Sequence, residues 1–99
     1  MLIARVIGTV VSTQKEPTLE GLRLLVCQPL NAEGEKAGTV VVAADAVGAG
    51  VGEVILFATG SSARQTVATQ NRPVDAVVMA IVDQWEVGGK TKYRKSEDK

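Results

Sequence analysis

The sequence predicts a small all-β domain of five strands, arranged as a barrel or a sandwich, with one short helix. The chain has 99 residues, which is enough for a single hydrophobic core. Its apolar stretches are short and rich in Val and Ile, whose branched side chains fit a pleated strand better than a helix. Segments containing Gly or Pro separate these stretches, as expected for turns between strands.

Each predicted strand is an apolar run bounded by such turn residues. Residues 31–38 (NAEGEKAG) contain two glycines between two of the runs, and we interpret them as a hairpin connection. The five runs are residues 2–13, 22–30, 39–44, 54–59 and 76–87.

The segment that differs from the strands is residues 60–66 (GSSARQT). A Ser near its start can accept hydrogen bonds from the free amides of a first helical turn, and the residues that follow are small or unbranched. We therefore predict a short α-helix of about two turns, which must end before Pro73.

The chain divides at its end into a β-domain, residues 1–88, and a charged C-terminal tail, residues 89–99. The last ten residues (KTKYRKSEDK) contain five basic and two acidic side chains. Two interpretations of this tail remain open at this point. It is a solvated terminus, or it docks onto a partner.

Composition argues against several classes of function. Eleven basic and eleven acidic residues balance to zero net charge, which does not favour a nucleic-acid binder. The chain has no His, the usual general base and metal ligand, and a single Cys. We therefore expect no catalytic site, no metal site and no cofactor. The first residues lack the pattern of a secretory signal, and no apolar run is long enough for a membrane span, so a cytoplasmic protein is expected.

The strands are apolar on both faces, which a lone barrel does not require. In residues 2–13 one alternating face begins with Leu2 and Ala4, and the other begins with Ile3. Strands of this kind usually lie beneath helices on both sides, and this chain is too short to supply them. We therefore predict a homo-oligomer in which further copies cover the second face, with a monomer as the alternative.

Several segments resemble the EutN/CcmL family of bacterial microcompartment vertex proteins. They occur in order across most of the chain: residues 3–15 (IARVIGTVVSTQK), 19–29 (LEGLRLLVCQP), 45–50 (DAVGAG), 60–65 (GSSARQ), 72–76 (RPVDA) and 81–83 (IVD).

This resemblance implies a specific fold and function. It implies an OB-like β-barrel with a short helix, assembled as a homopentamer that closes the vertices of a polyhedral shell. The implied partners are hexameric facet shell proteins and, if the tail of residues 89–99 docks onto a partner, encapsulated enzymes. The implied location is the microcompartment shell in the cytoplasm. The protein would then be structural and not an enzyme.

Two loops are candidates for the pore or symmetry axis of such a ring. The glycines of residues 47–52 (VGAGVG) permit positive φ or close backbone approach, and the next element is a strand, which argues against a nucleotide loop. The predicted helix start at residues 60–64 offers free amides beside a basic side chain, which together favour an anion. An ordinary turn and an ordinary cap are the alternatives. The axis candidates are Gly48, Ala49, Gly50, Ser61, Ser62 and Arg64.

Charged residues near the ends of strands are candidates for contacts between subunits. An Arg can form a two-pronged bond to a carboxylate, either within a subunit or across an interface. Cys27 is expected to be a buried structural thiol, because no His is available to activate it. The interface candidates are Arg5, Arg72, Asp75 and Asp83.

The alternative function is an OB-fold nucleic-acid-binding module. Such modules stack bases on aromatic side chains in a basic groove. The chain has three aromatic residues and no net charge, so the sequence favours the structural function.

Overall fold

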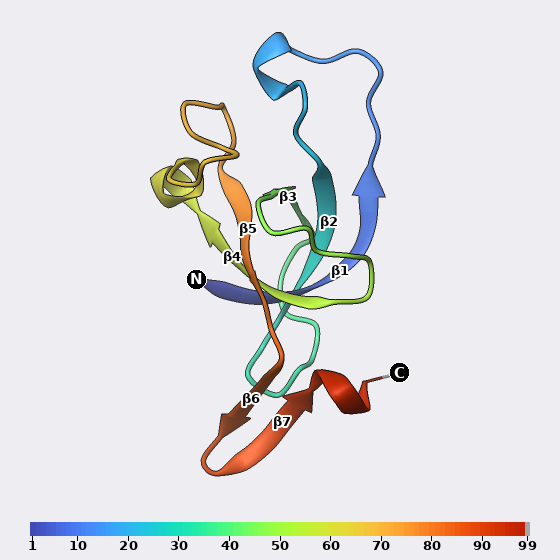
Figure 1. Ribbon diagram of the computed structural model, residues 1–99. Coiled ribbons are helices and arrows are strands. Elements are labelled where there is room, and N and C mark those ends of the chain that lie inside the picture. The colour runs from blue at the N-terminus through green and yellow to red at the C-terminus, as the bar shows by residue number, and fades with distance from the viewer. Residues whose placement is uncertain (99) are drawn as a thin grey trace.

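Five strands close into a barrel (Figure 1). In the computed structural model, which describes residues 1–98, they are β1 (Leu2–Val10), β2 (Leu24–Leu30), β3 (Val41–Asp45), β4 (Val54–Thr59) and β5 (Ala76–Ile81). Their order around the barrel is β1-β2-β3-β5-β4, and β4 pairs with β1 to complete the circle. All pairings are antiparallel except that of β3 with β5. The predicted all-β barrel of five strands is confirmed.

The interior of the barrel is filled mainly by small and branched side chains. Phe57 is the largest residue that is fully buried there, and four alanines belong to the same core cluster. Ala49 enters the same core from the loop between β3 and β4. The buried core residues are Ala4, Val6, Leu25, Cys27, Ala43, Ala49, Ile55, Phe57, Ala76 and Val78.

A second apolar cluster lies outside the barrel. Val77, which alternates with the inward-facing Val78 on β5, packs there with Ala44, Ala58 and Ala63. Ala63 belongs to η2, a 3₁₀ helix at Gly60–Arg64. The chain thus covers the outer face of β5 itself, whereas the sequence predicted that further copies of the chain cover the second face of the strands.

The outer side of β1, β2 and β3 keeps an uncovered apolar face. A β-bulge between Val6 and Gly8 leaves Ile7 without a partner on β2, and its side chain is 49% exposed. The pairing of Gly8 with Val26, and of Val26 with Val42, continues this face across the sheet. Because Val42 is 48% exposed, this region retains the apolar surface that the sequence predicted.

The predicted α-helix over residues 60–66 is wrong: η2 is a five-residue 3₁₀ helix. The Gln65 amide donates to the Ser62 carbonyl, the i+3 bond of a 3₁₀ turn. The Ala63 carbonyl, which an α-helix would pair with residue 67, instead accepts the buried Thr69 hydroxyl at 2.5 Å. This competing bond ends the helix after five residues.

The C-terminal residues form a second, two-stranded sheet. The expected strand over residues 76–87 ends at Ile81, and the chain continues as β6 (Gln84–Val87) and β7 (Lys90–Arg94), followed by the 3₁₀ helix η3 (Lys95–Glu97). The hairpin projects from one end of a molecule measuring 46 × 25 × 23 Å (Figure 1). The predicted tail, residues 89–99, therefore contains the second strand of a hairpin. Only Lys99 lies outside the described residues.

Aromatic stacking joins the two strands of the hairpin, and contacts with the loop between β2 and β3 attach the hairpin to the barrel. The rings of Trp85 and Tyr93 stack with centroids 5.2 Å apart, and the indole N–H of Trp85 donates to the Ala32 carbonyl at 2.8 Å. An ion pair of 2.7 Å joins Lys92 to Glu33 in the same loop. The connection between β1 and β2, residues 11–23, is a long loop that carries a 3₁₀ helix, η1 (Pro17–Leu19).

Val78→Ala is expected to lower the free energy of unfolding by about 2 kcal/mol, because it removes two methyl groups from a fully buried position. Val67→Ala makes the same chemical change at a residue that is 97% exposed, and it serves as the matched control with an expected change near zero. Denaturant unfolding followed by circular dichroism measures both. Equal effects of the two substitutions would contradict the assignment of Val78 to the core.

Candidate functional site

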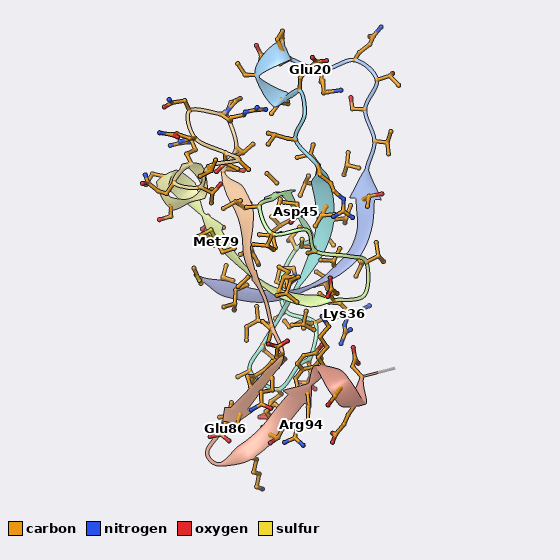
Figure 2. The ribbon with its side chains drawn as sticks, in the orientation of Figure 1. Glu20, Lys36, Asp45, Met79, Glu86 and Arg94 are labelled. Carbon is orange, nitrogen blue, oxygen red and sulfur yellow. The ribbon has the colours of Figure 1, made fainter. Side chains whose placement is uncertain are left out.

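The loop of residues 46–52, here the glycine loop, is held by the carboxylate of Asp45 at the end of β3 (Figure 2). One carboxylate oxygen accepts hydrogen bonds from the amides of Val47, Gly48 and Ala49 at 3.0, 3.1 and 3.3 Å. The other oxygen pairs with Arg23 at 2.9 Å. This is an Asx-type turn, in which a side chain replaces the backbone acceptor that a tight turn lacks.

These contacts lower the pKa of Asp45 below its usual value of 3.8. Burial acts in the opposite direction and raises the pKa, because it disfavours the charged form. The hydrogen bonds from the Val47, Ala49 and Gly48 amides and from Arg23 together outweigh burial. The glycine loop therefore keeps its conformation through the ionised carboxylate of Asp45, whose side chain is only 3% exposed.

The far end of the glycine loop is tied to the C-terminal segment. The Gly50 amide donates to one carboxylate oxygen of Glu53 at 2.6 Å, and the other oxygen pairs with Lys95 of η3. Arg5 donates to the Gly52 carbonyl at 2.7 Å and pairs with Asp98 at 2.9 Å. Arg5, a predicted subunit contact, thus has partners within its own chain.

Within this loop the three axis candidates have different surroundings. Ala49 is buried in the barrel core, so its side chain is not available to line an opening. Gly48 is exposed and has a φ of 77°, which a residue with a side chain adopts at a cost. Gly50 is half-buried against Glu53. Gly48 and Gly50 therefore remain candidates for the symmetry axis, where only their backbone atoms could line an opening.

A second site is a polar hollow between η2 and the segment that leads into β5. Arg72 donates to the carbonyls of Thr18 and Glu20 at 3.2 and 2.5 Å, and so joins the hollow to the long loop after β1. Figure 2 shows Glu20 at the end of the molecule opposite Glu86 and Arg94 of the hairpin. The hollow has a volume of about 630 Å³ and is lined by Thr18, Ser61, Arg64, Gln65, Asn71, Arg72 and Pro73.

The two predicted axis loops lie at opposite ends of β4 (Figure 1). The glycine loop precedes Val54, and η2 follows Thr59. Six residues of strand span roughly 20 Å, so these loops form two separate sites and not one. Ser61 and Arg64 line the polar hollow, whereas Ser62 is exposed and its carbonyl completes the 3₁₀ turn.

The remaining predicted contacts are made by main-chain atoms. Within residues 1–98, neither Asp75 nor Asp83 forms an ion pair, and both are exposed. The Asp75 carbonyl accepts from the Gly60 amide at 2.9 Å, and the Asp83 carbonyl accepts from the Lys95 amide at 2.7 Å. Arg72 and Asp75 do not pair with each other within this chain, because Arg72 turns toward the long loop.

Cys27 is a buried structural residue, as the sequence predicted. Burial, with a smaller contribution from Asp45, raises the pKa of its thiol to about 11. A thiol that is protonated at neutral pH is a poor nucleophile. In the described part of the chain, no three His, Cys, Asp or Glu side chains are grouped as a metal site. No helix among residues 1–98 is long and apolar enough to cross a membrane.

Sequence reasoning missed the residues that hold the glycine loop. Arg23, Glu53, Lys95 and Asp98 all contact that loop or its anchors, and none was a candidate. The Asp-x-x-Gly spacing of residues 45–48 is a known signal for an Asx turn and predicts the role of Asp45. No comparable local signal predicts Lys95 or Asp98, because both reach the loop from the far end of the chain.

The structure is thus a closed five-stranded barrel that keeps an apolar face exposed on β1, β2 and β3. The family model described as ethanolamine utilisation protein EutN/carboxysome matches residues 1–83. The chain belongs to this EutN/CcmL family.

Relatives agree over nearly the whole chain. The carboxysome shell vertex protein CcmL of Synechococcus elongatus is 50% identical over 97 residues, which are 98% of both chains. The solved structure of Gloeobacter violaceus CcmL superposes with a TM-score of 0.93 at 46% identity, covering 98% of this chain and all of that one. The pentameric microcompartment shell protein GrpN of Rhodospirillum rubrum superposes with a TM-score of 0.79 at 44% identity, covering 88% of this chain and all of that one.

Asp45→Asn is expected to lower the free energy of unfolding by about 1–2 kcal/mol at pH 7, because the three loop amides and Arg23 lose a charged acceptor. Because the pKa of Asp45 in the folded state lies below its usual value of 3.8, the ionised carboxylate stabilises the fold at pH values above 3.8. This stabilisation disappears as the pH falls through the folded-state pKa. The difference between the two proteins should therefore shrink below about pH 4. Thermal unfolding across pH 3–8 measures it, and a difference independent of pH would contradict this role for Asp45.

Proposed function

We propose that this protein forms a homopentamer that occupies the vertices of a bacterial microcompartment shell in the cytoplasm. The observation that carries the proposal is the match, across nearly the whole chain, to shell vertex proteins and to a solved pentameric shell protein. A structural function is consistent with the described residues, among which the single thiol, that of Cys27, is buried and inert.

The apolar face on β1, β2 and β3 supports a ring. Two different sides of each subunit meet in a head-to-tail ring, which closes at a fixed number of copies. Ile7 and Val42 are half-exposed on one such side, and covering them removes apolar surface from water. Favourable burial at each contact then stabilises the ring without any bound ligand.

The mechanism of a vertex protein is geometric. A flat lattice of sixfold units closes into a polyhedron only when fivefold units are inserted. We infer that hexameric facet proteins surround the pentamer. We propose that β7, the strand within residues 89–99 on which Lys90 and Arg94 are exposed, contacts encapsulated enzymes.

The nucleic-acid-binding alternative finds less support in the structure. Phe57 is fully buried, Trp85 and Tyr93 stack on each other, and Tyr93 is buried beneath the guanidinium of Arg5, 6.0 Å from its ring centroid. None of these rings forms a platform on the barrel for stacked bases.

The purified protein is expected to run as a stable pentamer at micromolar concentration, as measured by native mass spectrometry. Val42→Lys places a charge on the apolar face and is expected to shift the protein toward smaller species. Val67→Lys makes the same change at a residue that is 97% exposed and should leave the pentamer intact. A folded wild-type monomer would contradict the proposal, and equal behaviour of the two variants would contradict the assigned face.

Deletion of the protein from its host is expected to leave shell facets that form but close poorly, because the fivefold positions stay empty. Electron microscopy should show elongated or open bodies in place of sealed polyhedra. Re-expression of the wild-type chain should restore closed bodies, whereas the Val42→Lys variant should not. Sealed, regular bodies in a deletion strain that lacks any related protein would contradict a vertex role.

A further inference from the structure

The polar hollow between η2 and Pro73 has a charge imbalance that the vertex function does not explain. Two guanidinium groups, those of Arg64 and Arg72, line it together with hydroxyl and amide side chains. No carboxylate is among the lining residues. Within residues 1–98 neither arginine forms an ion pair, although five other pairs occur there. Two positive charges therefore lie in one concave site without a negative partner.

The Arg72 guanidinium is fixed in place before any ligand arrives. Its bonds to the Thr18 and Glu20 carbonyls, at 3.2 and 2.5 Å, use one terminal nitrogen. Carbonyl oxygens orient the group but carry no formal charge, so the positive charge is not neutralised. Positioning by the protein removes part of the entropy cost of ligand binding.

The other lining side chains supply donors of the kind an oxyanion needs. Ser61 offers a hydroxyl, and Gln65 and Asn71 offer amides. Asn71 adopts a φ of 59°, a left-handed conformation that Asn tolerates better than most residues and that reverses the chain immediately before Arg72. The hollow, at about 630 Å³, has room for a small anion with its water molecules.

We propose that this hollow binds a small oxyanion of the phosphate, sulfate or carbonate class. The site differs from the one inferred from the sequence, which relied on amides at a helix start. A single 3₁₀ turn is too short to offer that, and the Gly60 amide already donates to the Asp75 carbonyl. The side chains of Arg64 and Arg72 carry the binding instead. Because all these residues belong to one chain, the proposal does not rest on the pentamer.

Titration of the full-length protein with inorganic phosphate, at constant ionic strength, tests this site. Amide resonances of Ser61, Gln65 and Asn71 are expected to shift and saturate with a Kd on the order of 1 mM. Arg64→Gln changes an exposed residue outside the core and is expected to weaken binding about tenfold. Arg94→Gln, at an arginine already paired with Glu97 on the hairpin, is the matched control and should bind as the wild type does.

The absence of saturable shifts, or equal phosphate affinity in the Arg64→Gln variant, would overturn the proposal. The site would equally be overturned if phosphate failed to bind while Arg64→Gln dissociated the oligomer in native mass spectrometry. In that case the guanidiniums receive a carboxylate of a neighbouring copy. Saturable phosphate binding by a protein that is not a pentamer would support the oxyanion site and contradict the vertex function, so the two failures are distinguishable.

Discussion

Pairing of β4 with β1 is the constraint on which the rest of the structure depends. Leu2 faces Phe57 in register and Arg5 faces Val54, so the first and fourth strands join the ends of what would otherwise be an open sheet. Closure removes the unpaired edges of the sheet and encloses a core of mostly small residues. It also fixes the position of β4, which has a loop at each end. The length of this strand separates the glycine loop from the polar hollow.

Each loop is then held by side chains from distant parts of the chain. Asp45 and Arg23 secure one side of the glycine loop, and Glu53 with Lys95 secures the other. Arg72 ties the hollow to the long loop after β1. Assembly surfaces made of loops require such fixing, because a mobile loop loses conformational entropy when a partner binds.

Much of the fold was predictable because short-range signals determine it. Val- and Ile-rich runs bounded by turns located all five barrel strands, and the resemblance of the motifs indicated the family. A Gly-Gly pair between two runs is a hairpin signal, and Gly88 and Gly89, both with positive φ, form the two-residue turn between β6 and β7, where the prediction placed only the start of a tail. The failed α-helix over residues 60–66 had no local warning, since the Thr69 hydroxyl that ends it comes from a buried loop residue. The hollow was equally hidden, because Thr18 and Arg72 meet only in the folded chain.

The separate hairpin sheet makes this protein modular. The family model matches residues 1–83, and β6 begins at the next residue, so the end of that match coincides with a structural boundary. In the described chain β6 and β7 pair only with each other. An evolving lineage can therefore replace the hairpin without breaking a barrel ladder, provided that the substitute offers new contacts to Ala32, Glu33 and Glu53. Such exchange would allow different proteins to carry different C-terminal elements on the same barrel.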